Sequence, residues 1–285
     1  PVVFRGLWTE SEAVRRWTPA YLRDAAGEVP VVVLDYQDAR SDDQFSDVAM
    51  KKLAFGDFID RLGKEPVYLN NSTELFLEIP ALFDHLETQR LDSLFACDVR
   101  ATQVFIGGRA VCSPLHCAFG GNFFLNIAGR KRWRLLSSRH AMDVLPIFSQ
   151  PFYYAASPWA YRDLSPDHAL WKLPYQEVVL EPGDVLYNPP WWWHEVENLD
   201  DFTVGCAVRH SHGGWTGLFR DPAWRTHPGL TAISLWPALQ LRYLLHKTRD
   251  LMPGQRESYV TGLNRLLGRS IRESFANLHG AEEVD

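Results

Sequence analysis

Two histidines in strand-like segments place the strongest constraint on how this chain folds. His116 lies within Ser113–Asn122, and His194 ends the segment Gly183–His194, which follows a Pro-Gly-Asp turn sequence. Alternating apolar residues around each histidine are typical of β-strands. The two imidazoles are 194 − 116 = 78 positions apart, with strands and turns between them. This pattern indicates a small β-barrel that brings both histidines to one non-haem metal ion.

The residue two positions after the first histidine departs from the usual metal-site pattern. An iron site of the two-histidine, one-carboxylate type requires an acid, and residues i and i+2 of a strand share one face. Here that position is Ala118. Glu195 follows His194 directly and alternates to the other strand face, so we do not expect it to substitute. The sequence therefore predicts a metal-binding scaffold with an altered ligand position.

The order of sequence patterns predicts a mainly β fold with added helices. Residues 1–95 mix β-branched runs with helical spacing, and residues 96–210 alternate strands with glycine turns. We expect one barrel domain over residues 1–227, including this mixed α/β lead-in. Residues 228–285 have helical spacing and should form a tail that buries an apolar stripe, with a homodimer as the predicted result. The irregular segment 139–175 is interpreted as a lid.

Charge and cysteine usage exclude several classes of protein. A formal net charge of −6 and a pI of 5.9 argue against nucleic-acid binding, which requires a basic surface. The sequence contains no uninterrupted apolar run of 18 residues, so we expect no membrane span. Residues 1–6 lack the charged and then apolar layout of a signal peptide. The four cysteines show no C-x-x-C spacing, which favours free thiols in the cytoplasm.

The basic run at residues 130–134 reads as a strand. Lys131, Trp133 and Leu135 share one face, while Arg130, Arg132 and Arg134 share the other. We expect the arginine face to be in contact with solvent and the lysine face to point into the barrel.

Four segments together resemble the JmjC/cupin-8 family of iron(II)- and 2-oxoglutarate-dependent oxygenases, of the type that hydroxylates an asparagine of hypoxia-inducible factor. They are Pro1–Leu7, Arg16–Leu22, Leu115–Leu136 and Gly183–His194. The resemblance implies a double-stranded β-helix (jelly-roll or cupin) core. It also implies iron(II) and 2-oxoglutarate as cofactors.

The resemblance also assigns roles to individual residues. It implies His116 and His194 as metal ligands and Lys131 as the cation that pairs with the distal carboxylate of 2-oxoglutarate. It places Ser113 and Tyr68 as hydroxyl partners of that carboxylate, Asn122 beside the co-substrate and Asn70 at the substrate. Apart from the resemblance, Trp193 is a further candidate for substrate binding. The Trp191–Trp193 run is interpreted first as core and barrel-mouth packing.

Two hypotheses follow from Ala118. In the first, the protein is an oxygenase with an altered (His/Ala/His) set of metal-ligand positions that hydroxylates or halogenates a small molecule, peptide or protein. A chloride in the vacant position would then restore the lost negative charge. In the second, the barrel has lost its facial triad and serves as a non-catalytic binding or scaffold protein. The inward lysine with hydroxyl partners argues for the first.

Overall fold

The computed structural model describes residues 1–36, 49–96, 98–109, 111–118, 120–144, 147–150, 154–157 and 159–211. The predicted helical tail at 228–285 and the homodimer expected from it lie outside these residues.

The larger of two antiparallel sheets has eight strands in the order β1-β12-β7-β14-β5-β4-β2-β3. Its strands are β1 (Val2–Phe4), β2 (Pro30–Asp35), β3 (Ala49–Ala54), β4 (Val67–Ser72), β5 (Asp98–Gly107), β7 (Gly121–Ala128), β12 (Val185–Asn188) and β14 (Thr203–Ser211). We call this sheet the major sheet.

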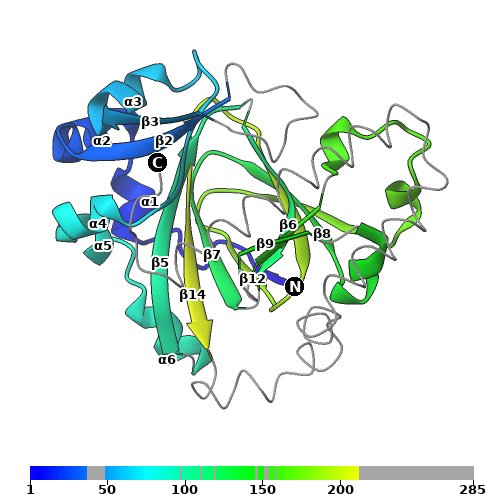
Figure 1. Ribbon diagram of the computed structural model, residues 1–285. Helices are drawn as coiled ribbons and strands as arrows, with labels where there is room; N and C mark the ends of the chain where they lie inside the picture. Colours follow the sequence, from blue (N-terminus) through cyan, green and yellow to red (C-terminus); the bar gives the residue numbers. More distant parts are fainter. Residues whose placement is uncertain are drawn as a thin grey trace, which may run out of the picture.

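The minor sheet has six strands in the order β11-β8-β13-β6-β10-β9. Its strands are β6 (Cys112–Ala118), β8 (Lys131–Leu136), β9 (Ile147–Gln150), β10 (Tyr154–Ala156), β11 (Gln176–Leu180) and β13 (Trp193–Asn198). Consecutive strands from β5 to β8, and again from β11 to β14, alternate between the two sheets (Figure 1). This alternation builds an eight-stranded jelly-roll core, so the predicted mainly β fold class is confirmed.

Residues from both sheets form the interior of the barrel. Phe124 and Ala207 of the major sheet pack with Trp133, Leu135 and Val196 of the minor sheet. Along β7 and β14 the alternate residues point outward into a second, larger hydrophobic cluster. The period of two along each strand therefore separates an inner wall from an outer one.

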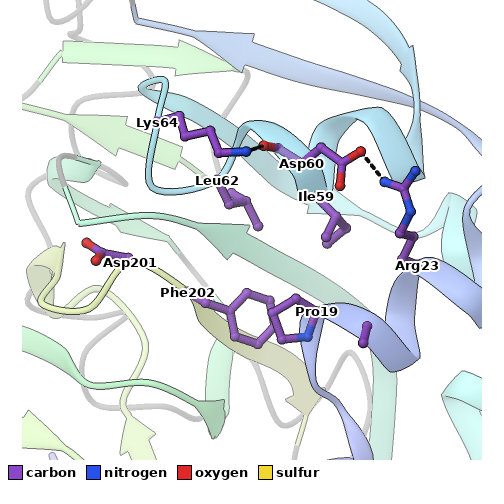
Figure 2. Close-up of a pocket in the computed structure, with 9 residues that line it drawn as sticks. Pro19, Arg23, Ile59, Asp60, Leu62, Lys64, Asp201 and Phe202 are labelled. Atoms are coloured by element: carbon purple, nitrogen blue, oxygen red, sulfur yellow. Dashed lines mark hydrogen bonds and ion pairs between the residues drawn. The ribbon is translucent and has the colours of Figure 1, made fainter.

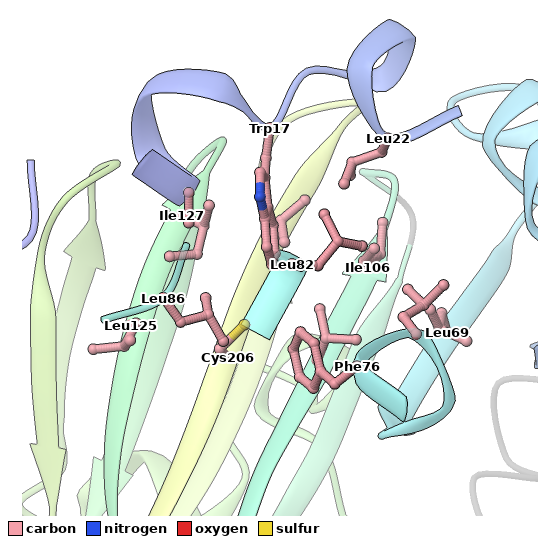
Figure 3. Close-up of a cluster of buried hydrophobic side chains, with 14 of the residues drawn as sticks. Trp17, Leu22, Leu69, Phe76, Leu82, Leu86, Ile106, Leu125, Ile127 and Cys206 are labelled. Atoms are coloured by element: carbon pink, nitrogen blue, oxygen red, sulfur yellow. The ribbon is translucent and has the colours of Figure 1, made fainter. Parts of the chain in front are cut away.

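Among the described residues of the N-terminal region are six short α-helices, and several of them cover the outer face of the major sheet (Figure 1). They are α1 (Glu12–Arg16), α2 (Pro19–Ala26), α3 (Phe55–Arg61), α4 (Glu74–Glu78), α5 (Pro80–Asp84) and α6 (Gln89–Phe95). The Ser11 and Thr18 side chains cap the first turns of α1 and α2, and Pro19 opens α2. Figure 3 shows the result: Trp17 and Leu22 pack against side chains of β5, β7 and β14.

Within the segment between β8 and β11, β9 and β10 extend the minor sheet beside β6, and the 3₁₀-helical parts pack on the outside of that sheet. The segment contains the 3₁₀ helices η1 (Ser138–Val144), η2 (Tyr161–Asp163) and η3 (Ala169–Lys172). Its Tyr161 and Leu170 are buried with Leu115, Cys117 and Leu136, whose side chains face away from the barrel interior. The described part of this segment is thus a packed outer layer, which corrects the lid interpretation.

The same layer changes the arginine face of β8. Arg132 and Arg134 form ion pairs with Glu197 and Glu195 on the neighbouring strand. Only 9% of Arg134 is exposed, because the segment around Tyr161 covers it. The predicted solvent-facing arginine face is therefore correct for Arg130, holds in part for the half-buried Arg132 and is wrong for Arg134.

In the part of the chain that the structure describes, every helix is too short or too polar to cross a bilayer.

Candidate metal and co-substrate site

The two predicted histidines lie side by side. His116 on β6 and His194 on β13 are direct cross-strand partners, and their ring centroids are 4.1 Å apart. Immediately beyond this pair the register shifts, because two residues of β6, Pro114 and Leu115, lie opposite the single residue Glu195 of β13. Adjacent strands thus bring together two residues that are far apart in sequence, as the sequence predicted.

Backbone contacts fix which nitrogen of each imidazole is available. Nδ1 of His116 is 2.7 Å from the carbonyl oxygen of Pro114, and Nδ1 of His194 is 2.9 Å from that of Trp192. A carbonyl oxygen only accepts, so each Nδ1 carries the proton and donates it. Each Nε2 then keeps its lone pair, which is the arrangement that metal-binding histidines adopt.

Burial keeps both imidazoles neutral. Desolvation lowers the pKa of His116 to about 4 and also lowers the pKa of His194. The positive charge of Arg209 lowers both pKa values further. No proton therefore competes with a metal ion for Nε2 at neutral pH.

Asn188, at the end of β12, is a site residue that the sequence analysis missed. Its side-chain amide is 3.2 Å from Nδ1 of His194, and its Oδ1 is buried with no hydrogen-bond partner. Exchanging the amide oxygen and nitrogen would let Oδ1 accept from the Nδ1–H of His194. Asn188 therefore supports the ring orientation of His194.

The position of the expected acid is occupied by Ala118, on the same face of β6 as His116. Glu195 and Glu197 do not compensate for it, because their carboxylates bond to Arg134 and Arg132 on the outer side of the minor sheet. Within the described ranges, no three His, Cys, Asp or Glu side chains cluster in a way that could hold a metal ion. The two Nε2 atoms fit a divalent transition metal, and the remaining ligands would have to come from outside these side chains.

Lys131 is almost fully buried in the same barrel. Its Nζ donates to Oδ1 of Asn198 at 2.6 Å and to Oγ1 of Thr203 at 3.0 Å. Both acceptors are neutral, and no ion pair joins Lys131 to a carboxylate among the described residues. Desolvation accordingly lowers its pKa to about 7. A buried amine without a counter-ion is suited to an anionic ligand.

The predicted hydroxyl partners lie close to this lysine. Tyr68 and Thr203 sit on either side of Gly107 in register, and a Cβ on Gly107 would meet both the Tyr68 ring and the Asn198 amide. The Tyr68 hydroxyl is 3.5 Å from Oγ of Ser113, at the long limit of a hydrogen bond. Burial raises the pKa of Tyr68, so its hydroxyl stays protonated and can donate.

An aromatic wall connects the lysine to the histidines. Trp133 stacks on His194 with ring centroids 5.3 Å apart and an interplanar angle of 18°. Phe124 meets Trp133 edge to face at 4.8 Å. These rings make the interior between Lys131 and His194 apolar, which strengthens any charge interaction within it.

The other predicted residues have different placements. Asn122 is buried on β7, and its Oδ1 has no hydrogen-bond partner. Asn70 is partly buried two residues after Tyr68 on β4. Trp193 is fully buried in the outer cluster with Leu115 and Trp191, on the opposite face of β13 from His194. The prediction that Trp193 contacts substrate in the barrel is therefore wrong.

A separate cavity of about 380 Å³ lies between α2, α3 and the residues that precede β14 (Figure 2). Pro19, Ile59 and Phe202 form its apolar side, and Asp60 pairs there with Arg23. None of the predicted site residues lines it, so it has no part in the site described above.

Comparison with known proteins places this architecture in a family. The cupin-like domain (Cupin_8) matches residues 1–210. HSPB1-associated protein 1 from Bos taurus is 28% identical over 186 residues, which cover 64% of this chain and 37% of that protein. Jumonji C domain-containing protein 5 from Drosophila melanogaster is 28% identical over 202 residues, covering 65% of this chain and 48% of that protein. The chain thus spans less than half the length of these two relatives.

A solved structure also resembles the chain: the ribosomal oxygenase YcfD from Escherichia coli. It shares 18% sequence identity with a TM-score of 0.45, over 77% of this chain and 49% of that one. The match of the cupin-like domain covers most of the sequence and all of the barrel, and the JmjC-domain relative matches as well. The predicted resemblance is confirmed, and the chain belongs to the JmjC/cupin-8 family.

Proposed function

We propose that this protein is a non-haem iron(II)- and 2-oxoglutarate-dependent oxygenase in which Ala118 stands where the acidic metal ligand would be. One observation carries the proposal: the two Nε2 lone pairs and the buried Lys131 amine belong to the same barrel interior. His116 and His194 would hold the iron, and Lys131 with Tyr68 and Ser113 would hold the distal carboxylate. When bound, iron(II) and 2-oxoglutarate would supply the activation of dioxygen.

The chain's own residues set the conditions for that chemistry. Pro114 and Trp192 carbonyls orient the two imidazoles, and Trp133 and Phe124 keep water away from the interior. Lys131 supplies one fixed donor, and the hydroxyls supply adjustable ones. The substrate would be a small molecule, peptide or protein, oxidised by hydroxylation or by halogenation.

A second candidate is a non-catalytic binding protein. Ala118 favours it, because two imidazoles without an acid bind iron less tightly than a complete triad. Retention of the buried lysine and its hydroxyl partners favours the enzyme, since a barrel with no anion to bind gains nothing from a desolvated amine.

The three described cysteines, Cys112, Cys117 and Cys206, are buried free thiols. This supports a reducing location such as the cytoplasm as part of the proposal.

Anaerobic titration with iron(II) and then 2-oxoglutarate tests the proposal. An enzyme of this type should develop a visible charge-transfer band when both are bound, and chloride should shift the band if a halide enters the Ala118 position. The His116→Gln variant is the control and should give no band. If the wild type binds 2-oxoglutarate with the same affinity with and without iron, and no band forms, the non-catalytic function is supported instead.

A further inference from the structure

The edge of the major sheet at β3 is open to solvent. β3 pairs with β2 on one side, and among the described residues no strand pairs with its other side. Residues 49–52 of this strand are all exposed. β2 and β3 lie beyond the barrel, away from β6 and β8 of the minor sheet (Figure 1). An edge of this kind presents backbone N–H and C=O groups that can pair with another chain.

The hydrogen bonds between β2 and β3 determine which backbone groups face outward. The N–H of Phe55, directly after β3, donates to the carbonyl oxygen of Val29, directly before β2. Hydrogen-bonded pairs alternate along an antiparallel ladder, and the register of these two strands has no shift, so the backbone groups of Lys51 also point toward β2. The N–H and C=O groups of Met50 and Lys52 therefore point to the free edge.

The side chains along this edge combine an apolar surface with a positive charge. Val32 and Met50 are 49% and 68% exposed and lie on one face of the sheet. Leu34, the cross-strand partner of Met50, continues this face toward Tyr68 on β4. Lys52 is exposed on the same face opposite Val32, and it forms no ion pair with any residue that the structure describes. The surface beside the open edge is thus apolar with one available ammonium group.

These features favour an extended peptide as the binding partner. A polypeptide strand supplies donors and acceptors at the spacing of the free groups on Met50 and Lys52, whereas a helix has its own backbone groups already paired. The ammonium of Lys52 favours an acidic side chain opposite it, and Met50 favours an apolar one two residues away. A second copy of this chain fits poorly, because antiparallel pairing of two β3 strands through the same groups would place Lys51 opposite Lys51.

We propose that the free edge of β3 binds an extended acidic segment of another protein by strand addition, with an acidic residue opposite Lys52 and an apolar residue opposite Met50. Three strand spacings, or about 14 Å, would separate this segment from β4, which contributes Tyr68 to the candidate site. The surface is therefore separate from the metal and co-substrate positions, and binding to it does not depend on the proposed function.

Fluorescence anisotropy with two labelled nonapeptides and the metal-free full chain tests this inference. The acidic probe alternates threonine with glutamate and valine, in the order Thr-Glu-Thr-Val-Thr-Glu-Thr-Val-Thr, and the basic probe has lysine in place of glutamate. Both probes can form the same backbone hydrogen bonds, so they differ only in charge. We expect the acidic probe to bind at least roughly tenfold more tightly, because it replaces repulsion at Lys52 by attraction.

Variants of two edge residues separate the charge from the backbone. Lys52→Glu should reverse the preference, so that the basic probe binds more tightly than the acidic one. Met50→Pro removes an outward N–H and leaves the hydrogen bonds to β2 in place, and it should weaken binding of the acidic probe at least roughly tenfold. Met50→Ala keeps that N–H and should weaken binding less. Lys172→Glu, at an exposed lysine of η3, is the control and should change nothing.

The results that would overturn the inference are specific. They are no binding of either probe, equal binding of both, or a preference that Lys52→Glu does not reverse, whether or not the protein binds iron and 2-oxoglutarate. Unchanged affinity in Met50→Pro would also overturn it. If that variant does not fold, the reversal in Lys52→Glu decides the question. A reversed preference in protein that binds no iron would support the inference although the proposed function had failed.

Discussion

Burial of Lys131 should make the affinity for 2-oxoglutarate depend on pH. Desolvation lowers the pKa of the amine to about 7. The amine is then about nine-tenths charged at pH 6 and about one-tenth charged at pH 8. A carboxylate binds the charged form, so affinity should fall roughly tenfold between these pH values.

The sign of proton exchange follows from the same pKa. A bound carboxylate stabilises the ammonium and raises its pKa, so binding at pH 8 should take up nearly one proton, and binding at pH 6 almost none. The histidines do not contribute to proton uptake between pH 6 and pH 8, because the pKa of His116 is about 4 and the pKa of His194 is also lowered.

Calorimetry on the zinc-loaded protein measures both quantities without oxygen chemistry. Titrations at pH 6, 7 and 8, each in two buffers of different ionisation enthalpy, give the dissociation constant and the protons taken up. Lys131→Arg is the matched control, because a guanidinium stays charged at every pH used and should remove the pH dependence. Lys131→Met should cost about 2–5 kcal/mol of binding free energy.

One result would refute this reasoning. If wild-type affinity is the same at pH 6 and pH 8 with no proton uptake, Lys131 is not the partner of the carboxylate. Equal pH dependence in the wild type and in Lys131→Arg would lead to the same conclusion.

Three further predictions concern the metal position, acid stability and the outer layer. Ala118→Asp should tighten iron binding and exclude chloride, since a carboxylate adds negative charge and a hard oxygen donor. A lower melting temperature of this variant, with no gain in iron affinity, would support the non-catalytic alternative. Metal-free protein should lose about 3 kcal/mol of unfolding free energy as the pH falls from 6.5 to 4, because the depressed pKa of His116 leaves the unfolded state binding more protons than the folded state. Urea titrations at both pH values measure this loss, and the His116→Gln variant should show a smaller one. Glu195→Ala should destabilise the fold by about 1.5–3 kcal/mol in urea titrations, because it removes the buried carboxylate that bonds to Arg134 and leaves this guanidinium with the more exposed Glu177 and Glu197. Arg132→Ala at the more exposed end of the network should cost less than about 1 kcal/mol.

Alternation along strands accounts for most of what the sequence predicted correctly. It placed His116 and Ala118 on one face, and it placed Lys131 and Trp133 inward on β8. The same rule, applied to the residue before His194, would have placed Trp193 outward and removed it from the substrate site. That error came from treating three tryptophans as one feature although neighbouring strand residues face opposite ways.

Other site residues depend on strand pairing, which a single sequence does not give. Asn188 contacts His194 because the turn between β12 and β13 brings the start of β13 beside the end of β12. Asn198 and Thr203 meet Lys131 from two different sheets. The packing of the irregular segment 139–175 over Arg134 could not be predicted either, because this segment has no hydrophobic periodicity that indicates which face it covers.

Electrostatics couples the two ends of the barrel interior. Without ligands, Lys131 gives up most of its charge above pH 7, and the histidines stay neutral. A metal ion alone would add positive charge to this interior, and a carboxylate alone would add negative charge. Each ligand therefore lowers the cost of binding the other, and by linkage the enhancement must be equal in both directions. Iron affinity measured with and without formate should change by the same factor as formate affinity measured with and without iron.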